Sequence, residues 1–493
     1  MKVGVVGGGP VGILFSKLCL EFGFEVILID AGGKTEESSH LSKKNYKFKS
    51  PSSIPEGVHK IGGGSNYWRA RISEFQEDDF NHQDLSGHKL WPFSKSELQP
   101  YYKELYKLLG AGEMTDNELA TNFFMPVQNK LLPEFNLRTF RFCDPSFFLK
   151  AFNEVENHKN LQLLLGHYCL EIRQDIESHK FYLELLPRNF IPRSIELDVV
   201  VLAGGAIQST ALIQRSPDLN GKPKVSGLGR YLMDHREGYV GTIIVKKQKE
   251  LELFSEMKLN SQNRVSDMFH GIGLAFSLAN PLLRNKINTH FEIRELMPKL
   301  YFSKFINITS KFVIVARFAL FLERVSKFIA RKLLEIFDKI LKIKRYSLYM
   351  KAEELPNSES RIYVDKQNSN LTIYDHRISE KTNQLIIEQL STLEATFRLK
   401  FNAKLRLYRK IRKRKFDQAT FSPNWHPMGT TRLGNGSIPS VCDANLEING
   451  VENCFVLSSS VFPSGSNSNP TFTTLALGLR LFNHIKYKNK LNS

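Results

Sequence analysis

One histidine in the C-terminal part of the chain is placed to exchange protons. His426 lies between Pro423 and Gly429, so we expect it on an irregular loop and not inside a helix. The ordinary pKa of histidine, near ~6.5, makes its imidazole a usable acid or base at neutral pH. A lone histidine is more often structural than catalytic, and the other histidines, such as His59 and His235, are interpreted as structural. His426 is the candidate for acid–base chemistry.

A second polar residue, Asn469, stands directly before a predicted helix. Asn469 and Pro470 match the residue preferences of an N-cap and a first helical position, so the sequence predicts a helix from Thr471 to about Lys486. The N-terminus of a helix exposes N–H groups that stabilise nearby negative charge. Asn469 is therefore predicted both to cap this helix and to face a reactive group.

The start of the chain carries the pattern of a dinucleotide-binding unit. Gly7–Gly12 fits G-x-G-x-x-G between the apolar run Val3–Val6 and a predicted helix. In this pattern Gly7 permits a tight turn, and Gly9 lets the backbone approach a pyrophosphate. Gly12 allows the helix to pack closely on the strand.

An acid and two further turns extend this predicted site. Asp30 ends a strand about 20 residues after the glycine turn, where an acid binds a ribose hydroxyl. Gly62–Trp68 forms a second glycine loop, and the apolar strand Val199–Leu202 ends in Ala203–Ala206. Neither is a second G-x-G-x-x-G motif, and two glycine loops around one extended ligand favour FAD over NAD. The predicted cofactor contacts are Gly7, Gly9, Pro10, Gly12, Asp30, Gly63, Gly64, Ser65, Asn66, Ala203, Gly204, Val461, Pro470 and Thr471.

Length and element order predict two closely joined domains in an α/β fold. A chain of 493 residues can bury a large core. We expect a Rossmann-like FAD-binding domain formed by residues 1–75, 131–235 and 419–493. A substrate domain of sheet and helices, formed by residues 76–130 and 236–418, should be interleaved with it. The substrate cavity is expected where this second domain covers the cofactor.

The cysteines and the hydropathy of the chain indicate the cellular compartment of the protein. No stretch of about 18 uncharged apolar residues occurs, which argues against a membrane-spanning helix. The first strand begins at Val3, which leaves no room for a signal peptide. The five cysteines are scattered and form neither a C-x-x-C pair nor a metal-ligand pattern. We therefore expect a cytoplasmic protein with buried thiols and no bound metal.

Positive charge is concentrated in two segments of this chain of net charge +18. Residues 304–345 hold eleven Lys/Arg against three Asp/Glu, and residues 404–415 hold eight and none. The rest is nearly balanced, so a nucleic-acid partner is not indicated. Apolar residues recur at helical spacing in 304–345, so this segment either lies on the anionic inner face of a membrane or packs on its own domain with a solvated basic face. Residues 404–415 are interpreted as an edge strand or an exposed loop.

These motifs together resemble the glucose–methanol–choline (GMC) oxidoreductase family. The likeness covers nearly the whole chain and includes both glycine loops, the run Trp91–Tyr102 and the run Gly229–His235. Its most specific parts are His426–Thr430 and Asn469–Thr471. Within the family the sequence looks closest to the bacterial branch that oxidises sugars and polyols.

The resemblance implies a site and a reaction. It makes His426 the catalytic histidine and Asn469 its partner beside the flavin N5, in the oxidation of a primary or secondary alcohol such as a sugar, a polyol or a glycan-linked hydroxyl. Some members attach FAD covalently through a histidine in the second glycine loop. Here that loop reads Asn66-Tyr67-Trp68, which implies non-covalent FAD. The electron acceptor stays open among oxygen, a quinone and a carrier protein.

Three alternatives remain at this point. A disulfide or pyridine-nucleotide flavoprotein would need a redox cysteine pair and a second NAD-type loop, and the sequence has neither. A membrane-associated flavoprotein could use a lipid or sterol-like alcohol. A non-catalytic flavin scaffold would leave His426 with a structural role only.

Overall fold

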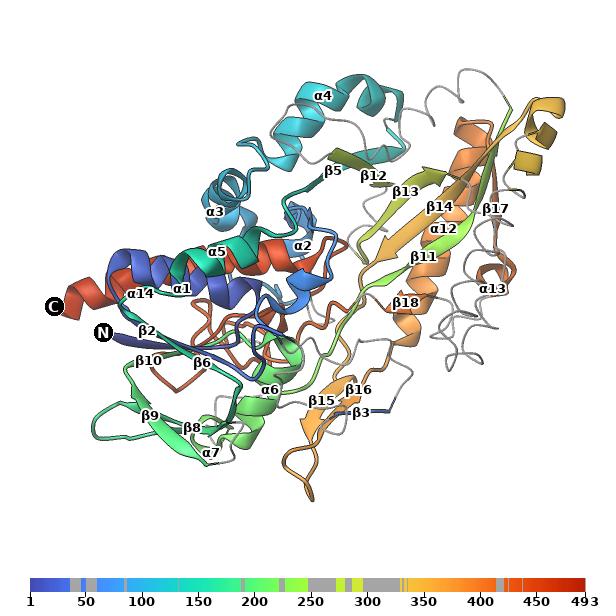
Figure 1. The fold of residues 1–493 in the computed structure, drawn as a ribbon. Helices are drawn as coiled ribbons and strands as arrows, with labels where there is room; N and C mark the ends of the chain where they lie inside the picture. Colours follow the sequence, from blue (N-terminus) through green and yellow to red (C-terminus); the bar gives the residue numbers. More distant parts are fainter. Residues whose placement is uncertain are drawn as a thin grey trace.

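The computed structural model describes residues 1–35, 46–49, 60–83, 87–131, 133–187, 191–220, 227–246, 272–279, 286–295, 329, 332–334, 336–413, 421–423, 425–436 and 438–492. These residues form two units, one around a parallel sheet and one around a large antiparallel sheet (Figure 1). Both ends of the described chain lie on the first unit.

The parallel sheet confirms the predicted Rossmann-like architecture. In the described residues its strands follow the order β19 (Cys454–Val456), β10 (Val199–Leu202), β1 (Lys2–Val6), β2 (Glu25–Asp30) and β6 (Leu161–Leu165), and every pairing is parallel. All four residues of β10 are buried, as a strand covered on both faces requires. The chain order β1–helix–β2 is the one predicted from Gly7–Gly12.

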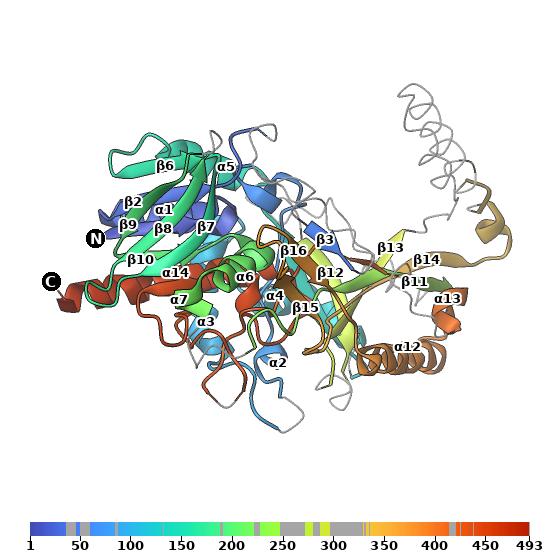
Figure 2. The same cartoon turned by 90° about the horizontal axis from the view of Figure 1, so that it is seen from below.

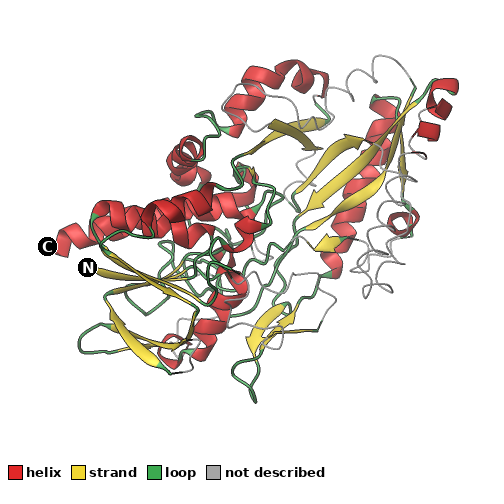
Figure 3. Ribbon diagram, in the orientation of Figure 1, coloured by secondary structure: helices red, strands yellow, loops and turns green. Residues whose placement is uncertain are grey.

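The two faces of this sheet are covered differently (Figure 3). Helices α1 (Pro10–Phe22), α5 (Phe147–Val155) and α14 (Pro470–Asn492) pack on one face. A three-stranded antiparallel sheet of β7 (His167–Gln174), β8 (Phe181–Pro187) and β9 (Arg193–Leu197) lies toward the other, with α6 (Gly205–Arg215) and α7 (Pro217–Asn220) beside it. Helix α14 begins at the predicted Pro470 and continues past the predicted end near Lys486.

The second unit is built on a sheet with eight strands among the described residues. Its order is β17 (Lys404–Leu407), β11 (Arg236–Val245), β14 (Lys344–Ala352), β13 (Thr289–Glu295), β12 (Ile272–Leu278), β5 (Phe135–Phe142) and β4 (Arg71–Ile72), with β18 (Ser422–Pro423) pairing to β11. Helix α12 (Glu380–Lys400) packs its apolar side chains, among them Leu385, Ile386 and Phe397, into the same core as this sheet. The opposite face of the sheet is turned toward the parallel-sheet unit.

Smaller elements connect the two units. A sheet of β3 (Tyr46–Phe48), β15 (Arg361–Val364) and β16 (Thr372–Asp375) lies below the large sheet in Figure 1. The remaining helices are the 3-10 helices η3 (Gly63–Asn66) and η4 (Ser459–Val461) and the helices α2 (Glu77–Phe80), α3 (Lys95–Leu108), α4 (Asp116–Leu131) and α13 (Arg409–Arg412).

The large sheet takes strands from all three segments that we assigned to the cofactor domain: β4 from residues 1–75, β5 from residues 131–235 and β18 from residues 419–493. Strand β5 falls in residues 131–235, which we assigned to the cofactor domain, yet it pairs with β12 and β4 of the large sheet. The reason is that Phe135 and Leu137 are buried in the core beneath α12. Strand pairing over such a sequence distance leaves no local signal. The rest of the domain division stays a prediction.

Several other expectations can be compared with the described residues. Residues 404–407 form the edge strand β17, one of the two readings of the basic segment 404–415. Most of residues 304–345, including Lys327 and Arg331, lie outside the described residues. All five cysteines are buried and unbridged: Cys19, Cys143, Cys169, Cys442 and Cys454. Among the helices described, none is long and apolar enough to cross a membrane.

Candidate functional site

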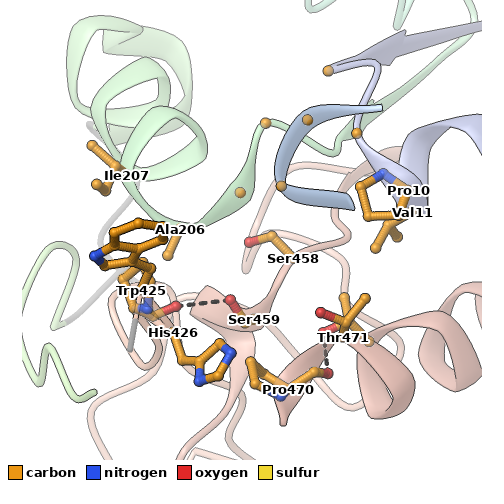
Figure 4. A pocket seen from close by; sticks show the side chains of 18 of the residues that line it. Pro10, Val11, Ala206, Ile207, Trp425, His426, Ser458, Ser459, Pro470 and Thr471 are labelled. Atoms are coloured by element: carbon orange, nitrogen blue, oxygen red, sulfur yellow. Dashed lines mark hydrogen bonds between the residues drawn. The ribbon is translucent and has the colours of Figure 1, made fainter. Parts of the chain in front are cut away.

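A single cavity of about 1270 Å³ runs between the two units. That volume exceeds the roughly 300–1,000 Å³ of a typical small-molecule pocket, as an extended dinucleotide and a substrate together would require. Figure 4 shows its walls: Pro10 and Val11 of α1, Ala206 of α6, and His426 and Pro470 all face the same space. The cavity thus joins the N-terminal glycine turn to the C-terminal His426.

The first glycine turn forms one end of the cavity. Gly7 has a positive φ of 118°, which a residue with a side chain would adopt only under strain. A Cβ on Gly12 would lie 1.9 Å from the Gly7 carbonyl oxygen, so only glycine permits this helix–strand contact. A Cβ on Gly9 would meet no protein atom within 4 Å, because Gly9 borders the open cavity. This bare backbone at the start of α1 is suited to a pyrophosphate.

Asp30 holds the turn from the neighbouring strand. Its two carboxylate oxygens accept hydrogen bonds from the Gly8 N–H at 2.6 Å and the Gly32 N–H at 2.7 Å. Burial raises the pKa of Asp30, and these two N–H donors oppose that rise. The carboxylate also lines the cavity, where its remaining lone pairs can accept from a ribose hydroxyl.

The second glycine loop lies against the first. Its backbone is tied to the turn by a hydrogen bond from the Gly62 N–H to the Gly8 carbonyl at 2.8 Å. The Ser65 hydroxyl donates to the Gly62 carbonyl, and the Asn66 amide donates to the Ile61 and Gly63 carbonyls. Ser65 and Asn66 therefore hold the shape of the loop, and only Ser65 of the two lines the cavity.

Most of the predicted contacts come together on this wall. The predicted residues that line the cavity are Gly7, Gly9, Pro10, Asp30, Gly63, Gly64, Ser65, Ala203, Gly204, His426, Asn469, Pro470 and Thr471. Three do not: Gly12 packs beneath Gly7, Asn66 braces its own loop, and Val461 is fully buried in the core. The sequence analysis missed His167, Tyr168 and Arg215, which line the cavity from β7 and α6.

His426 is held in place by a second histidine and a shared carboxylate. The Nδ1 atoms of His426 and His235 are 3.0 Å apart. One oxygen of Asp234 accepts from the backbone N–H groups of both residues, at 2.6 Å for His235 and 3.2 Å for His426. His235, interpreted from the sequence as structural, thus belongs to the site. Its place at the end of the run Gly229–His235, one of the motifs that carry the family resemblance, could have drawn attention to it.

The surroundings of His426 keep its imidazole neutral. Burial lowers its pKa well below the ordinary value, and the positive charges of Lys351 and Arg71 lower it further. The pKa of His235 is also lowered, first by burial and then by Lys351 and His426. A neutral His426 has one ring nitrogen free to accept a proton, which is the state that a general base needs.

Asn469 is held by groups other than those predicted. Lys351 donates to its Oδ1 atom, and its Nδ2 atom donates to the Arg71 carbonyl at 3.4 Å. Its amide oxygen, which would accept the predicted helix-capping hydrogen bond, accepts from Lys351. Asn469 and His426 line the same cavity.

The cavity wall opposite the glycine loops comes from the large sheet. We call it the sheet wall, and it consists of Arg71, Phe140, Phe142, Glu237, Tyr239, Arg294 and Tyr349. Side chains alternate between the faces of a strand. In β13, accordingly, Phe291 and Ile293 enter the core under α12 while Glu292 and Arg294 take the opposite face.

Charged and aromatic side chains contact one another on the sheet wall. Glu292 is fully buried and pairs with Arg71 at 2.5 Å and with Arg294 at 2.5 Å. The Arg294 guanidinium lies 3.5 Å from the centre of the Tyr349 ring, and Tyr239 meets Tyr349 edge to face. The sequence analysis missed all of these residues, because they are brought together only by pairing of distant strands.

Comparisons with known proteins agree with this architecture. Two solved structures cover 99% of this chain and 99% of their own: pyridoxine 4-oxidase from Mesorbium loti, at 17% identity and a TM-score of 0.58, and an FAD-dependent oxidoreductase from Chaetomium thermophilum in complex with a fragment, at 14% and 0.57. At these identities the likeness establishes the fold. No curated protein sequence matches the chain.

A family comparison is more specific. Residues 356–478 match the family model described as GMC oxidoreductase. This range contains both His426 and Asn469, which line the same cavity. The C-terminal part of the chain, with both candidate residues of the reacting end, is therefore similar to the GMC oxidoreductase family.

Proposed function

We propose that this protein is an FAD-dependent oxidoreductase that oxidises the CH–OH group of an alcohol. The observation that carries the proposal is the continuity of one cavity from the glycine turn at Gly7–Gly12 to His426 and Asn469. A nucleotide end and an acid–base end thereby belong to the same cavity.

The residues present fit FAD. The open backbone at Gly9 and the N-terminus of α1 would hold the pyrophosphate, Asp30 the ribose, and the loop Gly63–Ser65 the middle of the cofactor. Bound FAD would accept the hydride from the alcohol carbon. The loop carries no histidine, which supports non-covalent binding.

His426 and Asn469 would have different roles at the hydroxyl group of the substrate. Neutral His426 accepts the hydroxyl proton as the carbon loses its hydride. Asn469 donates from Nδ2 to the same oxygen and holds it as negative charge develops. The sheet wall orients the rest of the molecule.

The character of the sheet wall supports a sugar, a polyol or a glycan-linked hydroxyl as substrate. Tyr239 and Tyr349 offer ring faces, while Glu237 and Arg294 offer charged hydrogen-bonding groups to several hydroxyls. A lipid or sterol-like alcohol, the second candidate, would place hydrocarbon against these charged groups and remove their contact with water. The bacterial sugar- and polyol-oxidising branch is thus the favoured placement within the family.

The test is anaerobic mixing of the FAD-loaded protein with a panel of sugars, polyols and lipid-linked glycans. The proposal expects at least one to bleach the flavin absorption, and repeating the assay with oxygen, a quinone and a carrier protein identifies the acceptor. His426→Ala should retain FAD and lose about 10²–10⁴-fold in turnover. Asn469→Ala should also slow bleaching. Normal rates in His426→Ala would remove the catalytic assignment of His426, and the absence of bleaching by every alcohol would favour the non-catalytic scaffold.

We further propose that the protein touches the inner face of a membrane from its cytoplasmic side. Six apolar side chains, each more than half exposed, follow one helical face at the described residues of 329–341: Ile329, Leu333, Ile336, Phe337, Ile340 and Leu341. Exposed Lys339 and Lys342 flank them. Figures 1 and 2 place these helical turns at the outer end of β14, away from the parallel sheet.

Co-sedimentation with vesicles tests the membrane contact. Apolar burial and about 1 kcal/mol for each lysine near an anionic surface should give binding that weakens in high salt and on neutral lipid. Phe337→Asp with Ile340→Asp should release the protein, and so should charge reversal at Lys327, Arg331 and Lys332. Ile176→Asp, at a side chain 80% exposed beyond β7, is the matched control. If both the aspartate variant and the charge-reversal variant sediment with vesicles as the wild type does, the segment is better interpreted as packed on its own domain with a solvated basic face.

A further inference from the structure

One buried cation lies behind Asn469, a residue of the cavity wall. Lys351, near the end of β14, has a side chain only 2% exposed. It stands directly opposite Glu237 on β11 and His290 on β13, and its ammonium group is 3.9 Å from the Glu237 carboxylate. A lysine in this position is costly to bury, so its charge must be held by specific partners.

The partners of Lys351 fix which way the Asn469 amide points. An ammonium group only donates, so the atom of Asn469 that it meets must be the carbonyl oxygen Oδ1. The Arg71 backbone carbonyl only accepts, so the atom 3.4 Å from it must be the amide nitrogen Nδ2. Two independent contacts therefore assign the same orientation, in which Nδ2 is the donor left for a substrate oxygen.

The charge of Lys351 acts on its neighbours and is set by them. Burial lowers the pKa of Lys351 to about 8, with Arg71 lowering it too, while Glu237, Glu292 and Asp234 oppose the change. In turn the charge of Lys351 lowers the pKa values of three histidines in contact with the site: His235, His290 and His426. These groups come from every element that packs around the ammonium: β4, β11, β13 and the loops before β11 and after β18.

We propose that Lys351 is a positioning residue for the reaction: it holds the Asn469 amide with Nδ2 toward the alcohol oxygen and places a positive charge beside the oxygen as it loses its proton to His426. Donation into Oδ1 polarises the amide, and this strengthens Nδ2 as a donor. The inference rests on the proposed alcohol oxidation and adds a third member to the pair His426 and Asn469.

The pH dependence follows from the direction of each shift. Lys351 carries its charge below about pH 8 and loses it above, so turnover should fall as the pH rises through that value. Removing the charge also removes one cause of the low pKa of His426, so the acid limb of the profile should move to higher pH. A residue that served only to pack the sheet would produce neither change.

Two substitutions and a control test this role in the FAD-loaded protein. Lys351→Met should slow flavin bleaching by about 10²–10³-fold, the loss typical of an oxyanion-stabilising donor, and abolish the alkaline fall. Lys351→Arg keeps the charge above pH 8, so it should retain more activity than Lys351→Met and stay active in alkaline solution. Lys404→Met makes the same change on exposed β17 of the same sheet and should behave as wild type. A Lys351→Met protein with the wild-type rate and profile would overturn the inference.

A second measurement does not depend on any substrate. The folded-state pKa of Lys351, about 8, is below its ordinary value of 10.5, so between these values the unfolded chain binds more protons and folding stability rises with pH. The wild-type protein should therefore gain melting temperature relative to Lys351→Met as the pH increases from 8 to 10. If the melting temperatures of the wild-type protein and Lys351→Met change with pH in parallel, that result alone would refute a buried charge at Lys351. Failure of every alcohol to bleach the flavin would instead refute the proposed function. The melting temperatures would then still test whether Lys351 is a buried charge.

Discussion

At the scale of single residues, the contact between His426 and His235 decides which nitrogen of His426 is free. The two Nδ1 atoms are 3.0 Å apart, so one ring must donate and the other accept. In the tautomer that carries the proton of His235 on Nε2, His235 accepts at Nδ1 and leaves the Nε2 atom of His426 free to act as a base.

Substitution of His235 tests this arrangement. His235→Phe keeps a buried ring but removes the partner of His426 Nδ1, so turnover should fall by about tenfold to a hundredfold with little change in KM, a part of the ~10²–10⁴ that a positioned base contributes. His235→Asn restores a polar atom near the same place and should recover part of the rate. Steady-state kinetics on both variants decide the matter, and equal losses in the two would point to a packing role.

Residue types at the reactive end were only partly predictable. His426 and Asn469 stand in recognisable motifs, and the structure places both on the cavity wall. Lys351 stands in an ordinary stretch and His235 at the end of the run Gly229–His235, but the importance of both comes from contacts across 118 and 191 positions of the chain. No local pattern records such contacts.

At the scale of elements, the β1–α1–β2 unit was predictable because its signals are local. The glycine spacing, the apolar strands and Asp30 all lie within one supersecondary unit. The sheet wall was not, since its residues come from β4, β5, β11, β13 and β14, and which face of a strand meets the cavity depends on pairing. The same limit explains the misplaced boundary at β5.

Helix α1 offers a test of the glycine argument at this scale. A Cβ at Gly12 would lie 1.9 Å from the Gly7 carbonyl, so Gly12→Ala must push α1 away from β1. We expect lower FAD retention and a lower melting temperature. Gly478→Ala in α14 is the control, because its Cβ would make ordinary contacts of 3.5 Å and 3.8 Å with Leu457. Full FAD content in Gly12→Ala would show that the turn tolerates the shift.

At the scale of the whole molecule, the mode of cofactor attachment follows from the second glycine loop, Gly62–Trp68. Asn66 is consumed by hydrogen bonds within that loop, and Tyr67 and Trp68 offer no nitrogen nucleophile comparable to imidazole. Purified protein should therefore be yellow and should release intact FAD on denaturation. Chromatography of the supernatant after acid precipitation checks this, and flavin that stays with the precipitated polypeptide would contradict it.

The alternation of the sheet wall separates two tasks that share the same strands. In β14, Leu348 and Met350 secure the domain beneath α12 while Tyr349 between them meets the cavity. Substitution of Tyr349 or Tyr239 changes the wall of the cavity. It neither opens a void in the core nor affects the glycine turns that hold the nucleotide. New substrate preferences can therefore arise, in evolution or in a mutant library, by single substitutions. Such substitutions leave the hydrophobic core and the cofactor-binding turns unchanged.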